Sequence, residues 1–162
     1  MAEEKLICDL LTQQYALVMN ARAALLTYCG QLTEEDFLTN TSTFGRGSIR
    51  NLLVHIANVY EFWLLRNVSK IKTDIRDFDS VNNITGCVTY FETVDQIVKN
   101  FIREFKDRYD EEISVTLGDR SLMITPIQVF THVITHEFHH KGQILSLSRH
   151  LGYSPIDTDI IR

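Results

Sequence analysis

The chain has 162 residues, a length typical of one domain that buries a sizeable hydrophobic core. Hydrophobic residues make up 44% and charged residues 23%, so the composition excludes a disordered or fibrous chain. The formal net charge of −5 comes with no cluster of basic residues, which argues against nucleic-acid binding.

The chain begins with MAEEKLICDLL, which is acidic and lacks the long apolar run of a secretory signal. No later segment has the length of a membrane span. Cys8, Cys29 and Cys87 are widely spaced and form no C-x-x-C pair, which is typical of free thiols in a reducing compartment. We therefore expect a cytoplasmic protein that does not enter a membrane, with a single domain over residues 1–162.

Two amphipathic helices are predicted in the first part of the chain. Apolar residues recur at helical spacing from about residue 3 to residue 28, and Gly30 follows as a stop. The connector LTEEDFLTNTSTFGRG is polar, with a short helical turn expected at TEEDF. Ser48 is a suitable cap for the second helix, whose apolar stripe continues to about residue 67.

The helical pattern then fails from residue 69 to about residue 90, where DIRDFDSVNNITG is typical of a loop. Helical spacing returns over about residues 91–112, which predicts the third helix. Two short runs of β-favouring residues flank Gly118 and Asp119, and they indicate a small hairpin or an extended excursion.

The fourth helix has clear signals at both ends. Thr125, Pro126 and Gln128 form a capping box with proline at the first helical position, and the helix should end near His150, before Gly152. Four long amphipathic helices with one long connection predict an all-α protein, a four-helix bundle with a short hairpin before the last helix.

The fourth helix carries most of the chain's histidines. Since each helical residue advances about 100°, His132, His136, His139 and His140 lie on one face. Two histidines four apart can bind one ion, so a metal site is indicated; a pH-responsive or surface cluster and a coincidence are the alternatives. Spacing does not choose among the pairs His132/His136, His136/His139 and His136/His140. Outside this helix His55 is the only histidine, and bundle sites are built from facing helices.

His136, Glu137 and His140 also match H-E-x-x-H, the pattern of zinc metalloproteases. A protease needs a third ligand downstream. Gln143 and Ser146 stand where one group of these enzymes has glycine and histidine, and no glutamate follows Glu137 for the other group. A zinc protease is therefore only a remote alternative.

Three stretches together resemble the DinB/YfiT-like family of metal-binding four-helix bundles. GSIRNLLVHIANVYEFWL (47–64) is similar to the family's second helix, THEFHHKGQI (135–144) to its fourth-helix signature, and LGYSPIDTD (151–159) to the segment that follows. With the order of the helices, the resemblance spans nearly the whole chain. Lys141 stands where the family more often has arginine, which keeps the charge but loses the planar fork.

The resemblance implies that His55, His136 and His140 are the metal ligands. Three imidazoles favour a divalent transition metal over Mg²⁺, and the family is associated with nickel and zinc in particular, with iron a further candidate. Beside this set, Glu137 is a candidate general base or ligand-orienting carboxylate, or else a solvated or interface group. His132 and His139 accompany the site.

The resemblance also implies two classes of function. One is a metal-dependent enzyme, either a transferase that uses a low-molecular-weight thiol such as bacillithiol, mycothiol or glutathione, or a hydrolase in which Glu137 is the candidate base. The expected partner is then a small-molecule substrate, with no nucleic acid. The other class is a non-enzymatic, stress-associated metal-binding protein. The family's habit and the long apolar helix faces make a homodimer the expected assembly.

Overall fold

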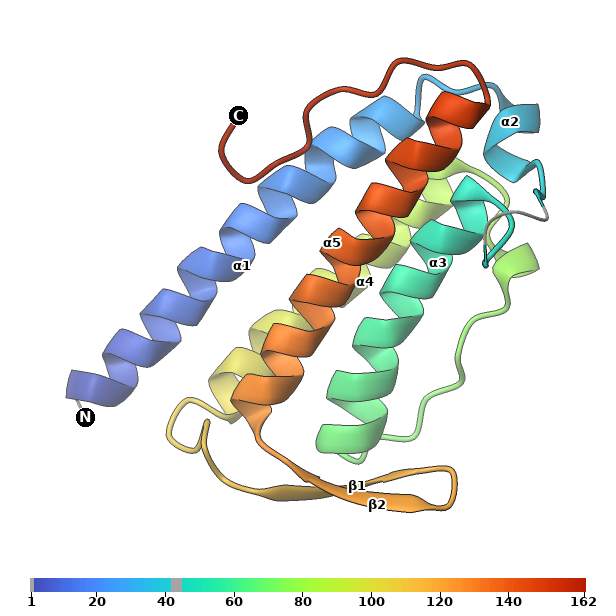
Figure 1. Cartoon of the computed structure of the whole chain (residues 1–162). Helices are drawn as coiled ribbons and strands as arrows, with labels where there is room; N and C mark the ends of the chain where they lie inside the picture. Colours follow the sequence, from blue (N-terminus) through green and yellow to red (C-terminus); the bar gives the residue numbers. More distant parts are fainter. Residues whose placement is uncertain (1, 42–44) are drawn as a thin grey trace.

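A computed structural model of the chain describes residues 2–41 and 45–162. Four long helices lie side by side and form a bundle (Figure 1). They are α1 (Ala2–Cys29), α3 (Ile49–Tyr60), α4 (Ile84–Glu104) and α5 (Pro126–His150). A short helix, α2 (Glu34–Leu38), follows α1, as the TEEDF segment predicted. The all-α fold class is thus confirmed.

The second long helix changes its winding halfway along. Ser48 caps α3, as expected, because its hydroxyl accepts a hydrogen bond from the Asn51 amide at 3.1 Å. After Tyr60 the helix continues as a π-helix, η1 (Glu61–Val68). The side chain of Asn67 donates to the carbonyl oxygen of Phe62 at 2.7 Å, which provides that carbonyl with a partner inside the wider turn.

Helix α4 is displaced towards the N-terminus from the predicted range. It begins at Ile84 instead of about residue 91, because the Asn83 side chain accepts a hydrogen bond from the Gly86 amide at 2.9 Å and caps it there. It ends at Glu104 instead of residue 112. Phe105 and Tyr109 are buried as the apolar pattern predicted, but from a series of turns after the helix.

The predicted hairpin is present between α4 and α5. Strands β1 (Ile113–Leu117) and β2 (Arg120–Ile124) pair antiparallel, with Val115 opposite Leu122. The capping box at the start of α5 is complete, since Thr125 and Gln128 exchange hydrogen bonds. At the other end, Gly152 has a φ of +91°, a conformation that suits glycine after a helix.

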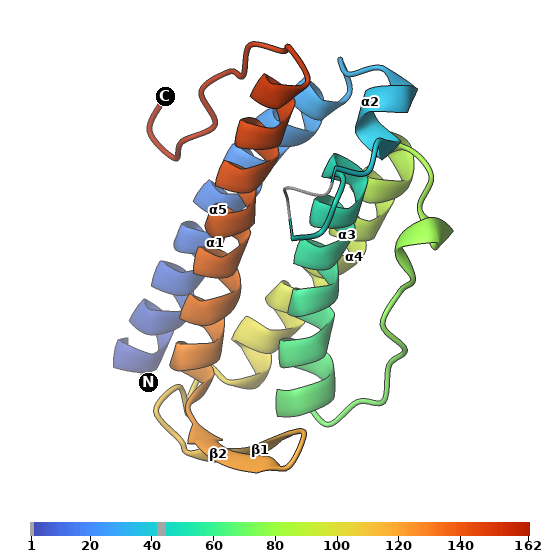
Figure 2. The same cartoon turned by 45° about the vertical axis from the view of Figure 1, so that its right-hand side comes forward.

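One hydrophobic core joins the helices. Helix α3 packs against both α4 and α5, and α1 packs against α4 and α5. The connection between η1 and α4 runs along the outside of α3, where it forms one short 3₁₀ turn, η2 (Phe78–Ser80) (Figure 2). Among the described residues, no helix combines the length and hydropathy needed to cross a bilayer.

Candidate metal centre

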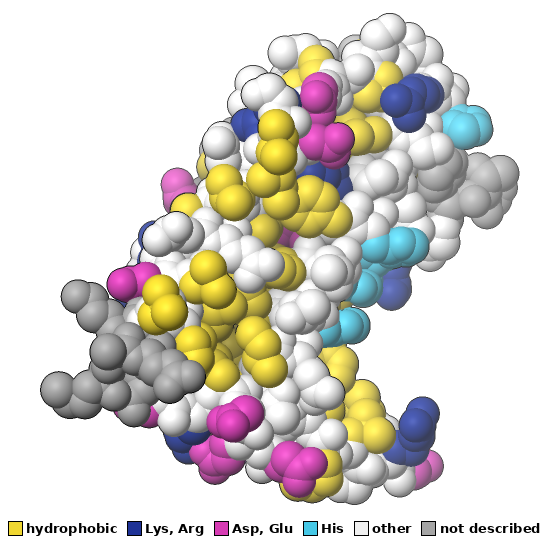
Figure 3. Space-filling view, turned by 60° about the vertical axis from the view of Figure 1, so that its left-hand side comes forward, with side chains coloured by type: hydrophobic (Ala, Val, Ile, Leu, Met, Phe, Trp, Pro, Cys, Tyr) yellow, Lys and Arg dark blue, Asp and Glu magenta, His cyan; other side chains and the backbone are white. Residues whose placement is uncertain are grey.

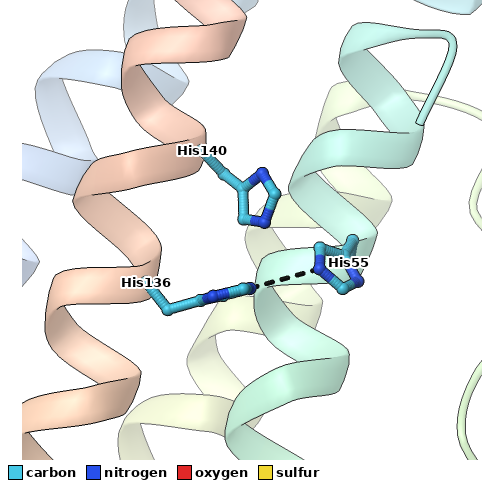
Figure 4. A group of neighbouring side chains, drawn as sticks. All are labelled: His55, His136 and His140. Atoms are coloured by element: carbon cyan, nitrogen blue, oxygen red, sulfur yellow. Dashed lines mark hydrogen bonds between the residues drawn. The ribbon is translucent and has the colours of Figure 1, made fainter. Parts of the chain in front are cut away.

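Two facing helices bring three histidine side chains together. His55 comes from α3, and His136 and His140 come from α5, one turn apart on the face that packs against α3. One ring nitrogen of each histidine lies within 4.8 Å of those of the other two. The Nε2 atoms of His136 and His55 are 3.2 Å apart, and the three rings point towards one another (Figure 4).

All three imidazoles are held in the neutral form. Burial lowers the pKa of His55 to about 3, and the nearby charge of Arg46 acts in the same direction. Burial likewise lowers the pKa of His136 to about 4, assisted by His140. The pKa of His140 is also lowered, again mainly by burial. Neutral imidazoles carry the free lone pair that a metal ligand needs, so the donor set fits a divalent transition metal.

Gln143 fixes the orientation of one of these rings. Its side-chain oxygen lies 2.7 Å from Nδ1 of His140. Because this oxygen can only accept, Nδ1 of His140 must carry the proton and Nε2 must carry the lone pair. The Gln143 amide nitrogen in turn lies 3.2 Å from Nε2 of His139. Hydrogen-bonded partners of this kind hold metal ligands in the correct tautomer.

The other two histidines of the face lie beside this group. His132 is exposed, and its ring lies 5.1 Å from that of Trp63 and 5.6 Å from that of His136, between centroids. His139 is exposed on the outer side of Gln143. Both accompany the site, but the geometry groups His136 with His140 and His55.

Glu137 points away from the histidines, into the middle of the bundle. Its carboxylate is 2% exposed and accepts two hydrogen bonds from the Arg22 guanidinium, both at 2.8 Å. It accepts a third from the Tyr60 hydroxyl at 2.6 Å. The Nη1 atom of Arg22 donates a hydrogen bond to the Asp95 carboxylate of α4 at 2.6 Å. Glu137 is therefore placed in a buried network that links all four long helices.

A pocket of about 490 Å³ borders the site on the side of His55. Its walls come from α3, the start of η1 and the connection that runs along them. Arg46 lies at this junction, with its Nη2 atom 3.4 Å from Nε2 of His55. A pocket of this volume next to three clustered imidazoles has the size of a small-molecule site. No pattern of residues along the chain indicated this pocket.

The sequence profile of the DinB family matches residues 4–162, nearly the whole chain. The chain belongs to the DinB family. This DinB-family chain is also similar to the uncharacterized protein YizA of Bacillus subtilis (strain 168), with 26% identity over 140 residues, which cover 83% of this chain and 84% of YizA. Family membership and the three-histidine group together fit a metal-binding DinB-like protein.

Proposed function

We propose that this protein is a metal-dependent enzyme that acts on a small molecule, with a thiol-dependent transfer as its reaction. The observation that carries the proposal is the convergence of three neutral imidazoles, from His55, His136 and His140, beside a ligand-sized pocket. Three protein ligands leave a coordination position for a further group. A divalent ion held there supplies a Lewis acid that lowers the pKa of a thiol or a water molecule.

The protein's own residues have separate tasks in this proposal. His55, His136 and His140 hold the ion, and Gln143 keeps His140 in the tautomer that presents Nε2. Three nitrogen donors suit nickel or zinc best, with iron as a further candidate.

A transfer reaction is favoured over hydrolysis by the surroundings of Glu137. In the hydrolase expected from the sequence, Glu137 is the candidate general base for a water molecule at the metal. Both of its oxygens accept hydrogen bonds from Arg22, and one also from Tyr60, inside the core. This arrangement supports a structural role for Glu137 and argues against the hydrolase in which Glu137 is the base, so a thiol-dependent transfer is the better-supported chemistry.

The experiment begins with elemental analysis of protein purified without a histidine tag. We expect about one nickel or zinc ion per chain in the wild type, and loss of the ion in His55→Ala, His136→Ala and His140→Ala. His139→Ala is the matched control, because it removes a histidine from the same helix face and should keep the ion. Wild-type protein without a transition metal would overturn the proposal.

The reaction is tested with metal-loaded protein, a panel of low-molecular-weight thiols and model electrophiles. Thiol consumption that requires the metal and disappears in His136→Ala supports the transferase. If metal is bound but no thiol or ester in the panel turns over, the non-enzymatic metal-binding protein is the better reading.

We also propose that the protein is a homodimer. Leu6, Leu10 and Leu17 project from the same side of α1 and are exposed, at 66%, 62% and 46%. In Figure 3 the side of the molecule on which α1 lies is turned towards the viewer, and hydrophobic side chains gather there. Histidine side chains lie along the right-hand edge of the same view. A contact between two copies through α1 would cover these leucines and leave the histidine site open.

A further inference from the structure

The pocket beside His55 has a lining that indicates which molecules it takes. It is an open pocket between α3 and η1 on one side and residues 75–78 on the other. The side chains that decide its chemistry are three aromatic residues, two arginines and one metal-ligand histidine: Phe62, Trp63, Phe78, Arg46, Arg76 and His55.

Most of the wall is apolar. Phe62 and Trp63 pack edge to face, with their ring centroids 5.6 Å apart, and Val59 extends this surface towards His55. Across the pocket, Ile75 is 40% exposed although it is a large aliphatic residue. An apolar wall left open to water in this way favours a ligand with an aromatic or branched aliphatic body.

Two cationic groups interrupt this apolar lining. Within residues 2–41 and 45–162, neither Arg46 nor Arg76 forms an ion pair with a carboxylate. The Arg46 guanidinium instead contacts the neutral ring of His55, with its Nη2 atom 3.4 Å from Nε2. The Arg76 guanidinium lies over the Tyr90 ring, 4.1 Å from its centroid. Both groups therefore retain donors for an anion.

The single acidic residue among the lining side chains does not neutralise them. Asp77 caps the 3₁₀ turn, where its carboxylate accepts a hydrogen bond from the Asp79 amide at 3.1 Å. Two arginines against one carboxylate leave the pocket with an excess of positive charge, in a chain whose net charge is −5. A local excess of opposite sign attracts anions to this part of the surface.

The outer wall is fixed in place before any ligand arrives. Arg50 donates to the carbonyl oxygens of Phe78 and Val81 and pairs with Asp79 at 2.7 Å. The Asn58 side chain donates to the carbonyl oxygen of Arg76 at 3.0 Å. These contacts hold the connection against α3, so the pocket is largely preformed, which reduces the entropy lost on binding.

We infer that this pocket receives the substrate of the metal centre, and that the substrate is a small carboxylic acid with an apolar body. Arg46 and Arg76 bind the carboxylate, and Val59, Phe62, Trp63 and Ile75 contact the body. The assignment of this ligand as a substrate rests on the proposed function, because Arg46 places the ligand next to His55.

The test uses metal-free wild-type protein, so that the carboxylate cannot bind an ion instead. Trp63 is the only tryptophan of the chain, and its fluorescence therefore reports on this pocket. Phenylbutanoate, phenylbutanol and phenylbutylamine share one apolar body and differ in the charge of the head group. We expect saturable binding of the acid, about tenfold tighter than the alcohol, and weaker still for the amine.

Variants then test which side chains bind the carboxylate of the ligand and which contact its apolar body. Arg46→Gln and Arg76→Gln should each weaken binding of the acid about tenfold and leave the alcohol unchanged. Arg103→Gln, on the exposed side of α4, is the matched control and should change neither. Val59→Phe fills the pocket and should weaken both ligands.

Three results would overturn the inference: no saturable binding of the acid, equal affinities for acid and alcohol, or unchanged affinity in both arginine variants. These measurements need no metal, whereas the proposed function is tested by the metal content of the histidine variants. The two proposals can therefore fail separately.

Discussion

Gln143 shows how a single uncharged side chain can decide whether an imidazole is a ligand. Its oxygen accepts the hydrogen bond from Nδ1 of His140, so that Nε2 carries the lone pair that a metal ion would need. Without it, the ring can rotate or adopt the other tautomer. The residue lies in the KGQ part of the family signature, so its position in the sequence was visible, but its contact with His140 was not.

Gln143→Ala should therefore weaken zinc binding by about 10- to 100-fold while the fold is unchanged. The measurement is a competition titration against a zinc chelator of known affinity. Gln96→Ala, at an exposed position on α4, is the control and should bind zinc as the wild type does. Equal affinities of the two variants would contradict the role given to Gln143.

Two of the protein's three cysteines, Cys29 and Cys87, are unsuited to supply the thiol of the proposed reaction. Burial raises the pKa of the Cys29 thiol to about 12 and that of Cys87 to about 12, and each side chain is 1% exposed. Cys8 is partly exposed on α1. We expect a thiol reagent to label one cysteine per chain in the native protein at neutral pH and all three after denaturation. Rapid labelling of Cys29 or Cys87 in the native state would contradict this.

For single residues, the sequence predicted the placement of the histidines better than that of the residues next to them. The face shared by His136 and His140 follows from helical geometry alone, and the family resemblance added His55. Glu137 belongs to the same five-residue motif, yet a step of 100° around the helix turns it into the core. The partner that meets it there, Arg22, is 115 positions away, and no local pattern indicates such a pairing.

Between elements, the buried network around Glu137 links the four long helices on the side of α5 that faces away from the three histidines. Arg22 joins α1 to α5 and α4, and Tyr60 joins α3 to the same carboxylate. A buried ion pair contributes little net stability, but the removal of Glu137 leaves the buried Arg22 charge only partly compensated by Asp95 and deprives the Tyr60 hydroxyl of its acceptor.

Glu137→Ala should lower the free energy of unfolding by about 3 kcal/mol, as measured by urea denaturation. The double variant Arg22→Met/Glu137→Leu should recover part of this loss, because neither charge is then buried although the Tyr60 hydroxyl still loses its acceptor. Glu92→Ala, at an exposed position of α4, should change stability by less than about 0.5 kcal/mol. A loss below about 1 kcal/mol in Glu137→Ala would argue against the network's role.

The bounds of helix α4 could not be predicted from the sequence. The apolar pattern placed it over residues 91–112, because Gly86 and the polar residues around it are typical of a loop. The Asn83 cap and the burial of Cys87 and Tyr90 extend the helix backwards. At its other end, Tyr109 keeps the apolar spacing, but its hydroxyl bonds to the Ile102 carbonyl oxygen across a turn at 3.0 Å. Tertiary contacts here outweigh local preference.

For the whole molecule, the exposed leucines of α1 lead to a prediction about assembly. We expect light scattering to give a mass of twice the 18.7 kDa of one chain, and the single-chain mass for Leu10→Glu, since a charge at the centre of the contact cannot be buried unpaired. Ile71→Glu changes another exposed residue, at 53%, on the connection after η1 and should remain dimeric. A monomeric wild type would contradict the homodimer.

The architecture of the molecule was predictable because helical periodicity, caps and the capping box at Thr125 all agree with one another. The pocket was not predictable, because it depends on the path that the connection between η1 and α4 takes along α3. That path is set by Arg50 and Asn58, whose partners lie 18 to 31 positions further along the chain. A polar loop in the sequence gives no indication of where such contacts will hold it.

The distance of 81 positions between His55 and His136 also sets when the site can form during synthesis. The ribosome makes α3 and α4 long before α5, and a domain of this kind folds as a unit. A nascent chain that has released only α3 and α4 offers the metal a lone histidine. The three-histidine group therefore exists only after translation of the last helix, so under the proposed function a chain must contain α5 before it can bind the ion.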